Sequence, residues 1–153
     1  NSLVELRPGD RQIVDALSNR FARDPGRALL IDYGPANSET GDTLQAIRTH
    51  RKVPPLEQPG TADLTARVDF ESLIVAARQG GLTAYGPVEQ GEFLLGLGME
   101  SRAAALCQAA PGQRSVIARQ VWRLTDEQQM GQLFKLVCLD SAGLSTPPGF
   151  SAD

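Results

Sequence analysis

A carboxylate and a phenol stand at the end of a short apolar run in the first third of the chain. Residues 28–31 are apolar, Asp32, Tyr33 and Gly34 follow, and Gly34-Pro35 is a turn signal. The run fits a strand buried on both faces, as in parallel sheets, whose ligands lie beyond the carboxyl ends of the strands. We therefore expect Asp32 and Tyr33 at a binding edge. The alternative is that Asp32 caps a turn and Tyr33 packs.

Two further residues could contribute to the same chemistry. His50 is the only histidine and lies in a basic stretch, residues 48–52. A near-neutral pKa suits a proton acceptor or a substrate anchor, although a solvated basic segment is the simpler interpretation. Asp63 has no evident structural role, whereas Asp69 precedes an apolar helical pattern and is expected to be its N-cap.

Composition excludes several classes of function. The 153 residues carry a net charge of -3 and only 5% aromatic residues, so neither a nucleic-acid interface nor a basic membrane surface is expected. No apolar run reaches the roughly 20 residues of a membrane span. Cys107 and Cys138 are expected as buried free thiols. With one histidine and no ligand-like spacing, no metal site is predicted.

The elements that must position these residues alternate between helix and strand. Apolar periodicity and turn signals predict the order α-β-(long loop)-α-β-α-α-β, which suits part of a doubly wound α/β sheet. The long loop covers residues 34–62, and within it residues 43–50 could be a short strand or a helix. Trp122 is expected to pack with its helix. No Ser/His/Asp set, Cys/His pair or phosphate-binding glycine loop is present.

An ordered set of motifs nevertheless resembles one family. The motifs, in chain order, are Leu30-Ile31-Asp32-Tyr33-Gly34, Gly41-Asp42-Thr43-Leu44 with His50 after it, residues 59–70 (PGTADLTARVDF), residues 86–94 (GPVEQGEFL), Met130-Gly131-Gln132-Leu133-Phe134-Lys135 and Pro148-Gly149-Phe150. The set is similar to the C-terminal part of the MidA family. These are class I S-adenosylmethionine-dependent methyltransferases, related to a mitochondrial assembly factor of respiratory complex I that methylates an arginine. The family usually has His where this chain has Arg67.

The resemblance implies the C-terminal half of a Rossmann-like class I methyltransferase fold. Residues 1–153 would form that part of the domain, with a helical insertion at 91–125. The last strand would run antiparallel between the other two. The family's glycine-rich cofactor loop would lie upstream of Asn1, so no cofactor-binding residue is identified here. The cofactor implied is S-adenosyl-L-methionine, and we expect this chain alone to bind it weakly or not at all and to be inactive.

The resemblance also implies a function and its residues. The implied activity is methyl transfer to an arginine of a protein partner, such as a respiratory complex I subunit. The location would be the bacterial cytoplasm or the mitochondrial matrix. Candidate catalytic residues are Asp32, Tyr33 and His50. The implied substrate-binding positions are Asp32, Tyr33, Gly34, His50, Asp63 and Gln90. The alternative is a non-catalytic assembly module that binds its partner through residues 34–62.

Overall fold

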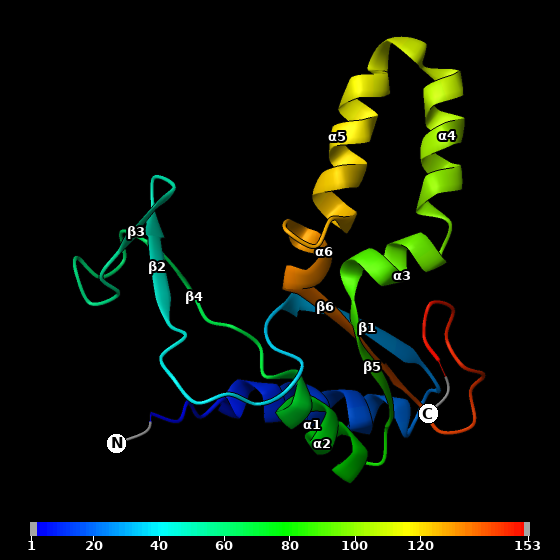
Figure 1. The fold of residues 1–153 in the computed structure, drawn as a ribbon. Helices are drawn as coiled ribbons and strands as arrows, with labels where there is room; N and C mark the ends of the chain where they lie inside the picture. Colours follow the sequence, from blue (N-terminus) through cyan, green and yellow to red (C-terminus); the bar gives the residue numbers. More distant parts are fainter. Residues whose placement is uncertain (1–2, 152–153) are drawn as a thin grey trace.

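A three-stranded sheet forms the centre of the computed structural model, which describes residues 3–151. Its strands are β1 (Arg27–Tyr33), β5 (Thr83–Glu89) and β6 (Phe134–Asp140). The order is β1-β6-β5, and β6 runs antiparallel to both neighbours (Figure 1). The last strand therefore lies between two strands that are parallel to each other. This confirms the sheet arrangement that the resemblance implied.

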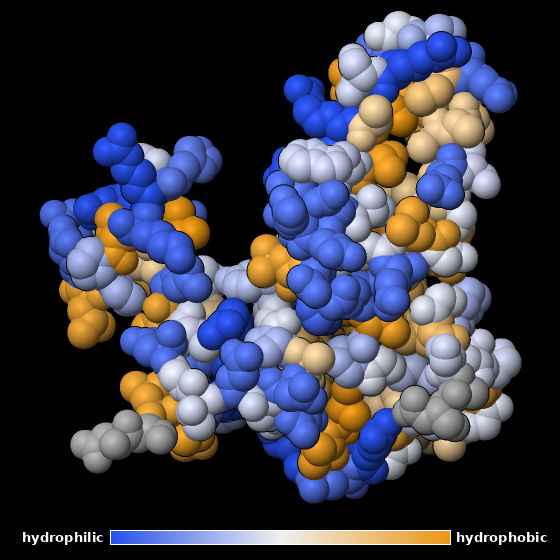
Figure 2. Space-filling model, in the orientation of Figure 1, coloured by the Kyte–Doolittle hydropathy of each residue, from blue (hydrophilic) through white to orange (hydrophobic). Residues whose placement is uncertain are grey.

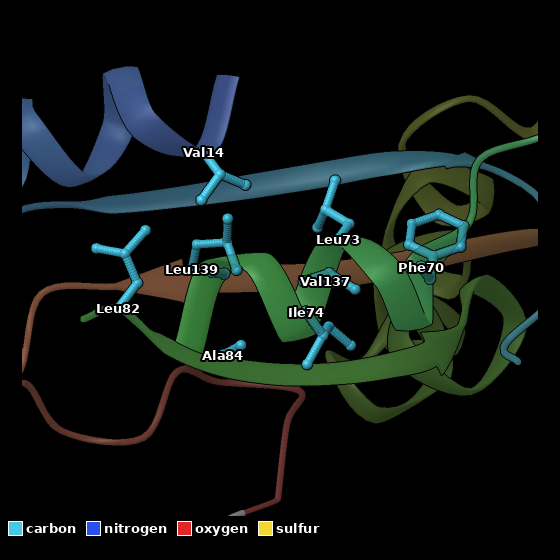
Figure 3. Packing of buried hydrophobic residues seen from close by; sticks show 9 residues of the cluster. Val14, Phe70, Leu73, Ile74, Leu82, Ala84, Val137 and Leu139 are labelled. Carbon is cyan, nitrogen blue, oxygen red and sulfur yellow. The ribbon is translucent and has the colours of Figure 1, made fainter. Parts of the chain in front are cut away.

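Two helices, α1 (Pro8–Phe21) and α2 (Phe70–Gln79), pack on one face of this sheet. Phe70, Leu73, Ile74 and Ala77 fall on one side of α2 and are buried there. They meet Val14 of α1 and Val137 and Leu139 of β6 in a single apolar cluster (Figure 3). The period of 3.6 residues brings such positions to one stripe, so the sequence pattern itself selects the face that packs.

The start of α2 shows why the helix begins where it does. The Asp69 side chain accepts a hydrogen bond from the Ser72 backbone N–H at 3.0 Å. That bond satisfies one of the N–H groups that the first helical turn leaves without a partner. Gly80 follows the last turn and ends the helix. The predicted capping role of Asp69 is confirmed.

The prediction that the first strand is buried on both faces is wrong. Leu30 packs against the core, but its neighbours Leu29 and Ile31 are 48% and 51% exposed. Because side chains alternate across a strand, Leu29 and Ile31 point to the face opposite α1 and α2. β1 lies at an edge of the sheet. Its side chains are apolar on both faces, but only the face towards α1 and α2 is covered.

Residues 34–68 form an excursion between β1 and α2 that contains a second, smaller sheet. Its strands are β2 (Gln45–Arg48), β3 (Arg51–Val53) and β4 (Asp63–Thr65), in the antiparallel order β3-β2-β4. Residues 45–48 are thus a strand, which settles the alternative left open by the sequence. Figure 1 shows this sheet standing apart from the main one.

After β5 the chain is helical up to β6. The helices are α3 (Gln90–Gly96), α4 (Met99–Ala109), the short 3-10 turn η1 (Pro111–Gln113), α5 (Arg114–Thr125) and α6 (Met130–Leu133). α4 and α5 form a hairpin that projects beyond the sheet (Figure 1). Trp122, expected to pack with its helix, is 50% exposed. Within residues 99–109 and 114–125, no residue is buried.

The segment after β6 returns along the sheet. Asp140 is buried and accepts two hydrogen bonds from Arg27, at 2.8 and 2.7 Å, which ties the start of β1 to the end of β6. Phe150 packs against Phe93 and Tyr85. Both cysteines are free, Cys138 buried and Cys107 half-buried. Residues 3–151 include no helix with the length and apolar character needed to cross a membrane.

Candidate functional site

The carboxyl end of β1 presents Asp32 and Tyr33 at successive positions, whose side chains point to opposite faces of the strand. The Asp32 carboxylate is exposed, and it accepts a hydrogen bond from the Tyr33 backbone N–H at 2.8 Å. One of its oxygens therefore remains open to a cationic group. Asp32 does adopt the local turn contact of the alternative interpretation, yet this contact leaves the charge accessible.

Tyr33 lies with its ring edge-on to Phe134, the ring centroids being 5.9 Å apart. Burial of the phenol, and then the negative charge of Asp32, raise the pKa of Tyr33 above its usual value. A phenol with a raised pKa keeps its proton at neutral pH. Tyr33 is thus suited to donate a hydrogen bond and orient a group, and poorly suited to accept a proton.

Gly34 has a role in the backbone. A Cβ at this position would lie 2.1 Å from the Val68 carbonyl oxygen. The Val68 N–H donates to the Tyr33 carbonyl at 3.0 Å, so two segments far apart in sequence cross directly after β1. Only glycine allows that approach. The glycine fixes where the excursion of residues 34–68 leaves the sheet and where it returns.

A charged row crosses the sheet at this end, and sequence reasoning did not assign it. Lys135 of β6 pairs in register with Asp32 of β1 on one side and Glu89 of β5 on the other. Cross-strand partners share one face of a sheet, so Lys135 lies in a row between two acidic residues, Asp32 and Glu89. Lys135 is 9% exposed. Its ammonium donates to the Gln132 carbonyl and lies 3.9 Å from a Glu89 carboxylate oxygen.

The signal that could have identified Lys135 was its position in an otherwise apolar strand. A lysine is seldom buried unless its charge is balanced. Here Glu89 supplies that balance, and within residues 3–151 Lys135 forms no ion pair with Asp32. The edge of the sheet therefore combines an accessible carboxylate with a phenol that holds its proton.

His50 and Asp63 lie on the smaller sheet, away from this edge. Thr49 and His50 have φ values of 48° and 62° and form the two-residue turn between β2 and β3. Such turns require positive φ at both positions. Asp63 begins β4 and pairs with Ile47, at the same end of the small sheet as this turn. Both side chains are exposed, and Figure 1 shows that this sheet stands apart from the end of β1.

Gln90 lies apart from both the end of β1 and the small sheet. Its side chain is 7% exposed, and its amide donates to the Leu124 carbonyl at 2.8 Å. This bond satisfies a carbonyl in the last turn of α5 and attaches the hairpin to the end of β5. The six predicted substrate positions thus separate into three groups. The end of β1 holds Asp32, Tyr33 and Gly34, the small sheet holds His50 and Asp63, and Gln90 is interior.

Polar side chains near the two ends of the excursion form hydrogen bonds and an ion pair with each other and with the segment just before α1. We call this region the base of the excursion. The Thr43 hydroxyl donates to Glu5 at 2.6 Å, and the Arg67 backbone N–H donates to Thr43 at 3.2 Å. The Arg67 guanidinium lies 3.4 Å from Glu39. The cavity among these residues is about 10 Å³, room for at most one water molecule. Arg67 thus closes the base of the excursion.

The cavity at the start of β1 lacks the groups that would hold S-adenosylmethionine. One cavity of about 300 Å³ lies near the start of β1, between the ends of α1 and α2. Its lining includes Ser18, Phe21 and Gly80 and contains no carboxylate that could hold ribose hydroxyls. It also lies at the opposite end of β1 from Asp32. Within residues 3–151, no cluster of three His, Cys, Asp or Glu side chains could hold a metal ion.

Comparisons with known proteins agree with this architecture. The chain is 41% identical over 128 residues to the mitochondrial protein arginine methyltransferase NDUFAF7 homolog of Drosophila melanogaster, a match that covers 82% of this chain and 29% of that protein. It is 38% identical to NDUFAF7 of Rattus norvegicus, over 89% of this chain and 31% of that protein. The chain thus spans about three tenths of the length of these relatives.

Two solved structures share the fold. Both come from Burkholderia thailandensis and are 27% identical to this chain, with TM-scores of 0.78 and 0.77. Each match covers 91% of this chain, and 38% and 37% of the respective structure. The second structure is bound to S-adenosyl-homocysteine. Residues 1–88, more than half of the chain, match the family described as putative S-adenosyl-L-methionine-dependent methyltransferases. The chain belongs to that family.

Proposed function

We propose that this chain is the acceptor-side part of a protein arginine methyltransferase that uses S-adenosyl-L-methionine. The observation that carries the proposal is the identity of 35–41% to proteins named as arginine methyltransferases, over most of the chain. The accessible Asp32 carboxylate at the end of β1 supports it, because in α/β folds ligands bind at the carboxyl edge of the sheet. The protein substrate would be bound by the full-length enzyme.

The chemistry that this edge can supply is positioning. A guanidinium that accepts a methyl group must be held in line and must lose one N–H proton, which would pass to the accessible Asp32 carboxylate or to water. Asp32 would pair with the cation, and the protonated Tyr33 phenol would orient the acceptor by donating a hydrogen bond. Lys135 would keep the row of acids from binding a cation unselectively. His50 and Asp63, on the small sheet, would contact the substrate protein away from the reacting nitrogen.

The test of Asp32 uses the full-length enzyme and a peptide substrate. We expect Asp32→Asn to lower kcat/KM for arginine methylation by about 100-fold, because a charge-assisted hydrogen bond to a bound cation would be lost. Binding of S-adenosylmethionine, measured by calorimetry, should be unchanged. Asp15→Asn, an exposed acid on α1, is the matched control. Methylation at the wild-type rate in Asp32→Asn would remove Asp32 from the proposed site.

The second candidate function is a partner-binding module built on the excursion. The observation that favours it is that residues 45–65 form an ordered sheet with its own hydrogen-bonded strands. The partner would be a respiratory complex I subunit, and the location the mitochondrial matrix or the bacterial cytoplasm. These assignments rest on the family resemblance and on relatives named mitochondrial.

Deleting residues 36–58 in the full-length protein separates the two candidates. If the excursion recognises the substrate, KM for the protein substrate should rise about tenfold or more while S-adenosylmethionine still binds. The same deletion should leave methylation of a short arginine peptide nearly intact. Loss of partner binding with no methylation of any substrate by the intact protein would favour the non-catalytic module.

A further inference from the structure

The α4–α5 hairpin has an apolar surface that the rest of the chain does not cover. Within the two helices no side chain is buried, and the exposed fraction of Leu106 is 39%. The two helices pack against each other, while their outer surfaces face solvent on the projecting arm (Figure 1). Figure 2 shows hydrophobic residues along this arm, interleaved with strongly hydrophilic ones.

The apolar residues line a hollow between the helices. This groove has a volume of about 180 Å³. Its apolar lining is Met99, Ala103, Leu106, Ile117, Val121 and Leu124. Arg102 stands at the groove and also lines a second hollow of about 190 Å³, which continues towards Leu94 and Leu97 at the end of α3. The two hollows share Met99 and Arg102 and thus form one elongated surface.

The charge of this arm is opposite to that of the chain. Residues 99–125 contain four arginines and one glutamate, a net charge of +3, whereas the whole chain carries -3. Arg102, Arg114, Arg119 and Arg123 are all exposed, and none forms an ion pair within residues 3–151.

Arginines elsewhere in the chain are mostly paired. Arg11 and Arg20 on α1, for example, reach carboxylates at 3.0 and 2.9 Å. Residues 99–125 thus carry four arginines without an ion-pair partner in the described part of the chain, and one of them, Arg102, lines the apolar groove. An apolar centre with a charged rim is a common layout of binding surfaces, with complementary charge on the partner.

We propose that this groove, lined by α4 and α5 with Arg102 at its rim, binds an amphipathic α-helix of a partner protein whose apolar stripe is flanked by acidic residues. A helix presents apolar side chains at i, i+3, i+4 and i+7, a ridge that fits a furrow between two helices. An acidic flank would pair with Arg102, the arginine that lines both hollows. A lipid surface fits less well, because the apolar residues line a hollow and a flat surface reaches only its rims.

The test uses the full-length protein and two designed 18-residue helical peptides. Both carry leucine at i, i+3, i+4 and i+7, and one has glutamates on the flanks where the other has lysines. Calorimetric titration of each peptide measures binding. We expect micromolar binding of the glutamate peptide. The lysine peptide should bind at least about tenfold more weakly, and the difference should shrink at high salt.

Matched variants assign the binding to the groove. Arg102→Glu should weaken the glutamate peptide about tenfold, and Leu106→Asp should weaken both peptides. Arg23→Glu, an exposed arginine outside the hairpin, should change neither. All three positions are exposed, and unchanged circular dichroism would show that the variants fold. Equal binding of both peptides, or equal binding by Arg102→Glu and the wild type, would overturn the proposal.

Two further outcomes would also overturn it. One is binding of phosphatidylglycerol vesicles with no binding of either peptide, which would identify a lipid surface instead. The other is no peptide binding up to about 1 mM with slow hydrogen exchange throughout α4 and α5, which would show that the full-length protein covers the groove itself. Methylation activity enters none of these measurements, so they test the groove separately from the proposed function.

Discussion

The face of the sheet that carries α1 and α2 differs from the α4–α5 hairpin in almost every physical respect. On the sheet, Phe70, Val137 and Leu139 are at most 1% exposed and lie in one cluster. On the hairpin, helices of similar length contain no buried residue. Helical periodicity exists in both places, so periodicity alone does not decide burial. What decides it is whether a second layer is present to cover the apolar stripe.

The comparison also concerns the helix ends. α2 starts with a side-chain cap from Asp69, whereas the residues before α1, α4 and α5 make no side-chain cap hydrogen bond. Capping typically contributes about 1 kcal/mol per helix. Burial, which α1 and α2 share, therefore separates the core from the hairpin, and the cap adds to the stability of α2 alone.

The largest expected effect comes from emptying the core. Phe70→Ala should lower the free energy of unfolding by about 3–5 kcal/mol, because a fully buried aromatic leaves a cavity that its neighbours fill only partly. Leu106→Ala on the hairpin removes a 39% exposed side chain and should cost less than about 1 kcal/mol. Urea unfolding followed by circular dichroism measures both. Similar losses in the two variants would contradict the division between core and hairpin.

A smaller effect is expected from removing the cap of α2. Asp69→Ala should cost about 1 kcal/mol, since the Ser72 N–H would lose its hydrogen-bond partner in the first turn of α2. Asp15→Ala, an exposed acid in an i,i+4 pair with Arg11, should cost about 0.3–0.5 kcal/mol at most. The same unfolding measurement ranks the two. A larger loss in Asp15→Ala would mean that the cap contributes little.

The smallest expected effect is a difference in the reactivity of the two cysteines. Burial, and then the hydrogen bond to Asp140, raise the pKa of Cys138 to about 12, while Cys107 is half-buried on the hairpin. We expect native protein to react with one equivalent of a thiol reagent at pH 8, at Cys107, and with two equivalents in urea. Mass spectrometry of the labelled peptides identifies the site. Rapid labelling of Cys138 in the native state would show that the sheet opens readily.

The same thiol gives a pH dependence with a definite sign. The folded-state pKa lies above the unfolded value of 9.0, so the unfolded chain releases this proton first as the pH rises. The contribution to stability is complete below pH 9 and is lost between about pH 9 and 12. Cys138→Ser should flatten this part of the stability profile. An unchanged slope would assign the loss to other groups, such as Tyr33, whose pKa is also raised.

Much of the fold was accessible from the sequence, for identifiable reasons. Regular apolar spacing and turn residues located α1, α2, β1, β5 and β6 to within a few residues. The order of the strands and the antiparallel β6 came from the family resemblance. Short strands were missed, because three or four residues between turn signals, as in β3 and β4, carry too few positions to show a period.

The candidate site was less accessible for a different reason. Gln90 lies in a family motif, and the sequence does not distinguish an amide that binds a substrate from one that satisfies the Leu124 carbonyl. Lys135 was overlooked because its two acidic neighbours lie on other strands, and register is a property of the folded sheet. The exposure of Ile31 likewise depends on whether a second layer of structure covers that face of the sheet, which the local sequence pattern does not show.

The hydrogen bond from the Val68 N–H to the Tyr33 carbonyl holds the two ends of the excursion of residues 34–68 together. The two ends of the excursion meet regardless of the residues between them, so the main sheet does not depend on the length of the excursion. Closing a flexible loop costs only about 0.6 kcal/mol more each time its length doubles. Evolution could therefore lengthen, shorten or replace this segment with little loss of stability, as long as Gly34 is kept. Proteins that keep this crossing could in this way carry segments of different length between the same two elements.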